Sequence, residues 1–216
     1  MRIRMSSWLV LGLLAAVAPQ ARGASLDVHG YTLGERVQVH SPVRSGWVNT
    51  AELSASLDGV LGVAFCVDLA QTIGIGDHAV TVQALGSLPG TFEAAYLVNT
   101  WYPYLGGLGD HATAITALQL AIWEVRYETS GSYGLGNGLF SVASASGTAI
   151  AMAERMLGAL PAQIGATPGF SIAYSPKVQD QIWMGGGAPI PEPGSALLFF
   201  GGALALSMLS RRTTTS

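Results

Sequence analysis

The segment from residue 113 to residue 127 constrains the fold more than any other part of the sequence. Gln119 lies within it among large apolar residues that recur at three- and four-residue spacing, the pattern of an amphipathic helix: Ile115, Leu118, Ile122 and Val125. An unpaired carboxamide on the apolar side costs about 1–3 kcal/mol. Gln119 therefore needs a backbone partner in a loop, access to solvent at the edge of the face, or a chemical role.

The remaining segments predict an α+β protein. Asp110 or Thr113 is suited to cap the helix that follows it. Periodicity predicts further helices at 91–100 and 145–160. Runs of apolar and alternating residues predict strands at 26–31, 36–40, 45–53, 60–69, 78–85, 170–174 and 178–184. Because the helices fall between two groups of strands, we expect a β-sandwich or barrel-like body with a helical insertion.

The N-terminus has the order of a secretory signal peptide. Arg2 and Arg4 precede an apolar run at 8–18, and small residues follow it. The run is short for a membrane-spanning helix. We therefore expect residues 1–23 to be removed on export and the domain proper to occupy residues 24–184.

The C-terminus predicts a second targeting signal. A glycine- and proline-rich linker, 185–193, ends in Pro191-Glu192-Pro193, and a hydrophobic segment, 194–216, ends in a basic group with Arg211 and Arg212. This order resembles the PEP-CTERM sorting signal of Gram-negative bacteria that make exopolysaccharide. The resemblance implies a hydrophobic sorting helix that is transiently in the inner membrane, processing by an exosortase-type enzyme, and a final location at the cell surface or in the extracellular matrix. By physical criteria alone, the segment is a marginal membrane anchor.

The charge pattern argues against nucleic-acid binding. Five of the ten basic residues lie in the two terminal signals, whereas nearly all thirteen acidic residues lie in the body. An acidic surface repels phosphate backbones. The four histidines are scattered without metal-ligand spacing, so we expect neither a metal site nor a cofactor.

Cys66 is the only cysteine of a chain that we expect to be exported. Structural cysteines outside the cytoplasm come in pairs, because thiols oxidise there. Cys66 cannot form an intramolecular disulfide. An inert buried thiol, an intermolecular bridge and a chemically protected derivative all remain open.

Three segments resemble the Cys–Gln thioester domain of bacterial surface adhesins. They are Phe65-Cys66-Val67-Asp68, residues 95–103, and Leu118-Gln119-Leu120-Ala121-Ile122-Trp123. The resemblance implies that Cys66 supplies the thioester sulfur and that Gln119 supplies the acyl group. The domain is smaller than typical Gram-positive examples, and it ends in a sorting signal instead of a cell-wall anchor.

A thioester needs protection from water and a route for protons. The candidates for an apolar shield are Phe65, Trp101, Ile122 and Trp123. His111 and Asp68 are candidate proton shuttles, although Asp68 could equally be a turn or cap carboxylate.

These features predict an exported adhesion protein that bonds covalently to a surface amine or hydroxyl of a host or matrix target. Each molecule would react once, so the protein would not be a turnover enzyme. The alternative is a non-covalent structural protein of an exopolysaccharide or biofilm matrix, in which Cys66 and Gln119 pack without bonding.

Overall fold

The computed structural model describes residues 22–128 and 132–185, and it confirms the α+β class. The elements, in chain order, are β1 (Arg22–His40), β2 (Ser45–Leu57), β3 (Val60–Cys66), β4 (Gly76–Gln83), α1 (Thr91–Trp101), the 3-10 helix η1 (Tyr102–Gly107), α2 (His111–Tyr127), β5 (Ser141–Ser144), α3 (Gly147–Gly158), β6 (Phe170–Tyr174) and β7 (Gln181–Gly185).

The strand pairings run in a ring. The sheet order is β2-β3-β7-β6-β4-β1-β5, and β1 also pairs with β2, so six strands return to their starting point while β5 extends the end of β1. All of these pairings are antiparallel. The last strand, β7, thereby lies between β3 and β6 and is hydrogen-bonded on both sides.

The long strand β1 joins three partners. Its first part pairs with β4, most of its length pairs with β2, and its end pairs with β5. The sequence predicted two strands here, 26–31 and 36–40. The structure has one strand with register shifts at Val28/Gly30 and Leu33/Arg36. The second shift falls at the break expected between the two strands, because an irregularity there bends the strand without ending it.

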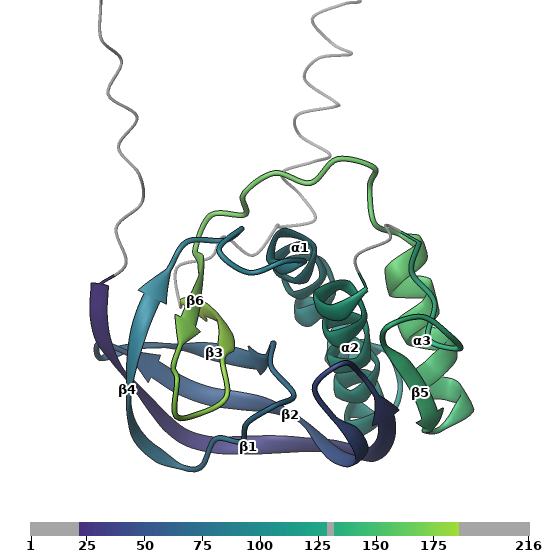
Figure 1. Cartoon of the computed structure of the whole chain (residues 1–216), viewed down its shortest axis with the longest axis horizontal. Coiled ribbons are helices and arrows are strands. Elements are labelled where there is room, and N and C mark those ends of the chain that lie inside the picture. Colours follow the sequence, from purple (N-terminus) through teal and green to yellow (C-terminus); the bar gives the residue numbers. More distant parts are fainter. Residues whose placement is uncertain (1–21, 129–131, 186–216) are drawn as a thin grey trace, which may run out of the picture.

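Helix α2 lies at the centre of the molecule (Figure 1). It packs against β1, β2 and β3 and against the helices α1 and α3. Every residue from Ala114 to Val125 is buried, so the helix is enclosed on all sides and is not amphipathic as predicted. Small residues, Ala114, Ala117 and Ala121, allow neighbouring elements to approach closely. Asp110 caps the helix as expected, because its side chain accepts a hydrogen bond from the Thr113 N–H at 2.9 Å.

Glu35 fixes α2 against the strands. The backbone N–H of Glu35 donates to Thr116 Oγ1 at 2.6 Å, and Thr50 Oγ1 donates to the Glu35 carbonyl at 2.8 Å. Its carboxylate accepts hydrogen bonds from Thr113 on α2 and from Ser146, the N-cap of α3. One residue at the irregular part of β1 therefore connects two strands to two helices.

The other differences from the sequence prediction are one short strand and several element ends. The strand β5 was not predicted, because four residues are too few to show a period. The strand predicted at 60–69 ends at Cys66, and the last strand begins at Gln181 instead of 178. The helix predicted at 145–160 is shorter, Gly147–Gly158.

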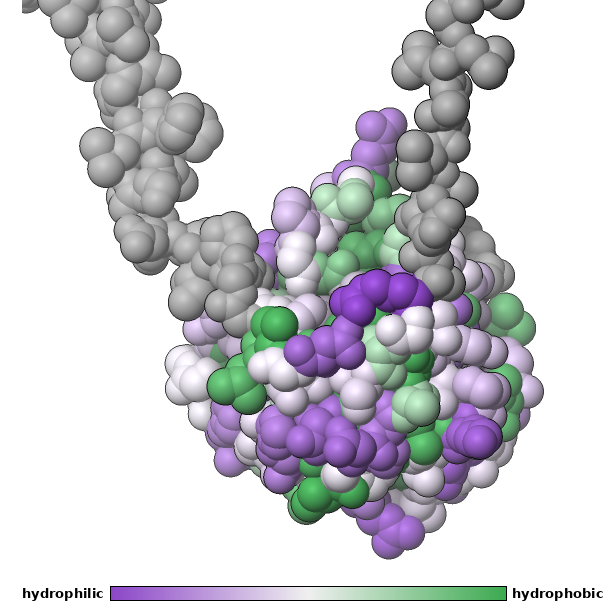
Figure 2. Space-filling model, turned by 90° about the vertical axis from the view of Figure 1, so that its left-hand side faces the viewer, coloured by the Kyte–Doolittle hydropathy of each residue, from purple (hydrophilic) through white to green (hydrophobic). Residues whose placement is uncertain are grey.

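Figure 2 shows one side of the molecule, on which apolar side chains form separate patches among polar ones. No helix in the described ranges is long and apolar enough to cross a membrane. The predicted signal peptide (1–23, apart from its last two residues) and the sorting signal with Pro191, Glu192, Pro193, Arg211 and Arg212 lie outside the described residues.

Candidate functional site

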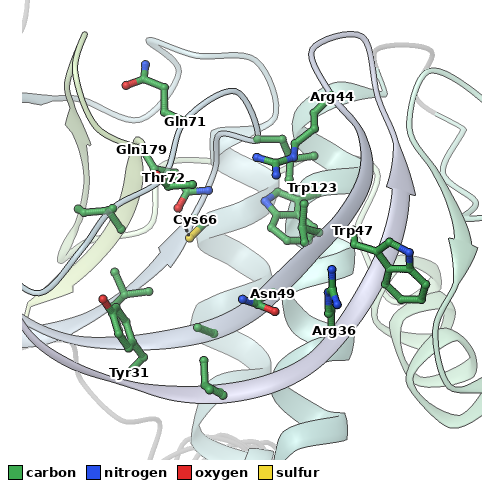
Figure 3. Close-up of a pocket in the computed structure, with 16 residues that line it drawn as sticks. Tyr31, Arg36, Arg44, Trp47, Asn49, Cys66, Gln71, Thr72, Trp123 and Gln179 are labelled. Carbon is green, nitrogen blue, oxygen red and sulfur yellow. Dashed lines mark hydrogen bonds between the residues drawn. The ribbon is translucent and has the colours of Figure 1, made fainter.

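Cys66 is the last residue of β3, and its side chain faces a pocket of about 620 Å³. The residue is 8% exposed. This volume lies within the range of ordinary ligand pockets. Figure 3 shows the sulfur at the base of the pocket, with Gln179 beside it. The only cysteine is therefore largely buried, but it still meets a cavity that a small ligand can enter.

Gln119 lies next to Cys66, but it binds the main chain of that residue. The Cys66 N–H donates to Gln119 Oε1 at 3.2 Å, and Gln119 Nε2 donates to the Cys66 carbonyl at 2.7 Å. Gln119 is fully buried. The first possibility that the sequence left open for this side chain, a backbone partner, is thus what the structure contains. The two bonds hold the end of β3 against α2.

Two other glutamines contact the sulfur itself. The Cys66 thiol donates to Gln179 Oε1 at 2.9 Å, and Gln181 Nε2 lies 3.6 Å from Sγ. Together with Gln119, three carboxamides surround one cysteine. The sequence predicted the convergence of Cys66 with a glutamine, but it did not predict the two glutamines of the last strand region.

Gln181 is held in place by the sheet. It is the residue of β7 directly opposite Cys66 in the β3–β7 register, and it is fully buried. Its Nε2 also donates to the Gln179 carbonyl at 3.1 Å, whereas its Oε1 has no hydrogen-bond partner. A buried carbonyl oxygen without a donor is costly, by about 1–3 kcal/mol. Gln179, in contrast, is partly exposed, and its Nε2 donates to the Asp68 carbonyl.

The pKa of the Cys66 thiol is raised to about 12, mainly by burial; the Gln181 hydrogen bond opposes this rise, and the negative charge of Asp68 adds to it. The thiol is therefore protonated at neutral pH. A group in this state is a poor nucleophile toward reagents in solution. Reaction at Cys66 thus depends on a partner that is already in contact with it.

The pocket has two walls of different origin. One wall is the β1–β2 ribbon, which contributes Tyr31, Arg36, Trp47 and Asn49. The facing wall is formed by Gln179 and the segment 71–73. Trp123 on α2, one turn after Gln119, also lines the cavity, and Arg44 enters from the turn between β1 and β2.

The predicted apolar shield is found only in part. Trp123 lines the pocket and is 1% exposed. Phe65 and Ile122 are fully buried but do not line the cavity, since neighbouring strand residues point to opposite faces and Phe65 instead contacts the ring of Tyr102. Trp101, at the end of α1, does not line the cavity either.

Neither candidate proton shuttle contacts the sulfur. His111 begins α2, two turns before Gln119, and lies 4.0 Å from Glu52. Asp68 Oδ1 accepts a hydrogen bond from the Ala70 N–H at 2.8 Å and lies 3.4 Å from the hydroxyl of Tyr127. Asp68 is thus a turn carboxylate, the second role that the sequence left open for it.

Several pocket residues could not be found from the sequence. Gln179 lines the pocket and lies just before β7, in a segment of mixed polarity that gave no signal. Arg36, Arg44 and Trp47 gave no signal either, because their convergence on the pocket depends on the ring of strands.

No group of three or more His, Cys, Asp or Glu side chains within residues 22–128 and 132–185 is arranged to hold a metal ion. No protein-family model, curated protein or solved structure matches this chain.

Proposed function

We propose that this protein is an exported surface or matrix adhesion protein that attaches covalently to its target through an internal thioester between Cys66 and Gln181. A barrel-like body with a helical insertion would hold the two side chains together. Each molecule would react once, and the product would be a bond between the protein and a target amine or hydroxyl.

The observation that supports this proposal most strongly is the contact between Cys66 and Gln181. The two residues face each other across β3 and β7, and Nε2, the leaving group of the reaction, lies 3.6 Å from the sulfur. Holding the two side chains in contact raises their effective concentration, which compensates in part for the raised pKa of the thiol.

The state of the carboxamides favours Gln181 over Gln119 as the acyl donor. Both polar ends of Gln119 are occupied by the main chain of Cys66. Gln181 has a buried Oε1 without a partner, and a thioester would keep this oxygen as a weaker hydrogen-bond acceptor than an amide oxygen, which lowers the cost of leaving it unpaired. Gln119 would then be a positioning residue that holds Cys66 in place.

Neither formation of the thioester nor its reaction with a target requires a cofactor. The sulfur attacks the Gln181 side-chain carbonyl carbon, the C–N bond breaks, and the thiol proton leaves with the nitrogen as ammonia. A target amine later attacks the same carbon, the C–S bond breaks, and a proton from the amine restores the thiol. Burial of Gln181 and Trp123 keeps water, the competing nucleophile, away from the acyl group.

Intact mass spectrometry of the purified protein tests the proposal. The thioester form is lighter than the unmodified chain by one ammonia, and methylamine adds to that form as one molecule. Gln181→Glu, an isosteric change, should abolish both effects, whereas the matched variant Gln179→Glu, at a partly exposed position, should retain them. Loss of the mass deficit in Gln119→Glu with its retention in Gln181→Glu would return the acyl role to Gln119.

The second candidate is a non-covalent structural protein of an exopolysaccharide or biofilm matrix. The raised pKa of Cys66 favours it, since burial also keeps a purely structural thiol inert. A wild-type protein of full mass with one titratable thiol would exclude the thioester and leave this alternative. Export, exosortase-type processing and retention at the cell surface or in the matrix are parts of both proposals.

A further inference from the structure

The pocket above Cys66 has a charge opposite to that of the protein around it. Its lining includes two arginines, Arg36 and Arg44, and no aspartate or glutamate. The chain as a whole has thirteen acidic residues against ten basic ones. Two cations are thus collected at a cavity that reaches the sulfur.

Neither arginine is neutralised by a carboxylate within the described part of the chain, where the ion pairs involve Arg22, His29 and His111. Arg36 stacks over the ring of Trp47, with 5.3 Å between its guanidinium carbon and the ring centroid. Stacking fixes the guanidinium and leaves its N–H groups available for an anion. Arg44 is only partly exposed at the pocket, so its charge acts in a region of reduced solvent screening.

In Figure 3 the two arginines lie on the Trp47 side of the pocket, and Cys66 lies away from them beside Gln179. A ligand that reaches both places must therefore have two functional groups separated by a spacer. One group binds guanidinium, and the other reacts at the acyl carbon.

We propose that this pocket selects nucleophiles in which a primary amine is joined to a carboxylate, with Arg36 and Arg44 binding the carboxylate while the amine attacks. The inference rests on the proposed thioester and names its substrate class. The amine nitrogen bonds to the Gln181 side-chain carbonyl carbon, the bond from that carbon to Cys66 Sγ breaks, and the amine proton passes to the sulfur. The carboxylate is unchanged and keeps its contacts with the arginines.

The test compares ω-amino acids of increasing chain length with amino alcohols of the same length. Each compound is incubated with the purified protein at equal concentrations of free amine base, and intact mass gives the rate at which the adduct forms. Three proteins are compared: wild type, the double variant Arg36→Gln/Arg44→Gln, and Arg155→Gln. Arg155 is an exposed arginine on α3 that does not line the pocket, so its replacement is a matched change of charge.

We expect an ω-amino acid of suitable length to react about tenfold faster than its amino alcohol in the wild type, because a hydrogen bond to a charged group contributes at least about 1.4 kcal/mol. The preference should persist in Arg155→Gln and disappear in the double variant. The mass deficit of one ammonia in the unreacted double variant would show that its site remains folded.

Equal rates for acids and alcohols in the wild type, or a preference that survives in the double variant, would overturn the substrate class while leaving the thioester in place. A wild-type protein of full mass that reacts with no amine would instead remove the thioester, and this inference with it.

Discussion

Cys66 and Gln181 are cross-strand partners although they are 115 positions apart in the sequence. Cys66 ends the third strand, and Gln181 begins the last one. Their juxtaposition is made by the β3–β7 pairing and not by any local motif. A bond between them would connect two distant parts of the chain inside the core.

A thioester between Cys66 and Gln181 should stabilise the folded protein. A crosslink that closes a loop of this size restricts the unfolded chain and stabilises the folded state by up to about 4–5 kcal/mol. Treatment with methylamine should therefore lower the free energy of unfolding of the wild type and leave that of Gln181→Glu unchanged. Urea denaturation before and after treatment measures the difference, and equal midpoints in the treated and untreated wild type would contradict it.

Replacement of Gln119 by alanine should destabilise the protein even when no thioester can form. The change leaves the N–H and the carbonyl of Cys66 without their present partners in a buried region. We expect a loss of at least about 2 kcal/mol, since each unsatisfied buried group costs about 1–3 kcal/mol. The measurement is urea denaturation in a Cys66→Ala background. Gln163→Ala, at an exposed position, is the control and should change stability by less than about 0.5 kcal/mol.

The Cys66 thiol should be almost unreactive at neutral pH when no acyl partner is present. Because burial raises its pKa to about 12, the thiolate fraction rises tenfold with each pH unit below that value. In Gln181→Glu, the rate of alkylation by iodoacetamide should therefore increase steadily between pH 7 and pH 10. A rate that levels off near pH 8.5, as we expect for the same protein unfolded in urea, would show that the pKa of the thiol is not raised by the fold.

Stability should fall as the pH rises from about 4.5 to about 7. The pKa of Glu124 is raised from 4.5 to about 7, mainly by burial; the Gly134 N–H hydrogen bond opposes this rise, and the nearby charges of Glu128 and Glu154 add to it. The folded state then holds a proton that the unfolded chain releases, so this contribution is fully present below about pH 4.5 and is lost through about pH 7. Glu124→Gln should reduce the fall, which we expect to be about 1–3 kcal/mol. Thermal unfolding at pH 5 and pH 8 compares the two proteins, and an equal fall in both would exclude Glu124 as its source.

Gly90, the residue before α1, should not accept alanine. Its φ is 72°, and a Cβ atom there would lie 1.9 Å from the carbonyl oxygen of Val125 on α2. Because Cβ is fixed by Cα and the carbonyl oxygen belongs to the backbone, neither atom can move aside, and the contact between α1 and α2 would have to open at a cost of more than about 3 kcal/mol. Gly106→Ala, where a Cβ meets nothing within 4 Å, is the control and should be close to neutral in thermal unfolding.

The sequence was most informative where the signal is local. The cap at Asp110, the boundaries of β6 and the existence of α1, α2 and α3 follow from patterns within a few turns of chain. The periodicity of 113–127 located α2 but suggested one buried face. The alanines on its other faces are equally suited to close packing. Periodicity alone therefore cannot distinguish a helix with one buried face from a helix that is buried on all sides.

The site was harder to predict, since its parts come from five separate segments. Cys66 was recognisable as a solitary thiol, and Gln119 as a carboxamide among apolar residues that would need a partner. The partner of Gln119, however, is the main chain of Cys66, and the sulfur meets Gln179 and Gln181. The pairing of strands 115 positions apart decides which glutamine meets the sulfur. Sequence periodicity contains no information on which distant strands will pair.

The place of Gln181 in β7 has a mechanical consequence. Gln181 lies only four positions before Gly185, where the strand ends and the C-terminal linker begins. If a target is joined to Gln181 and the protein is retained through its C-terminal segment, tension between the two passes along this short length of backbone. The other strands of the ring and the helices α1, α2 and α3 lie outside that path, so a pull strong enough to unravel the domain need not break the attachment.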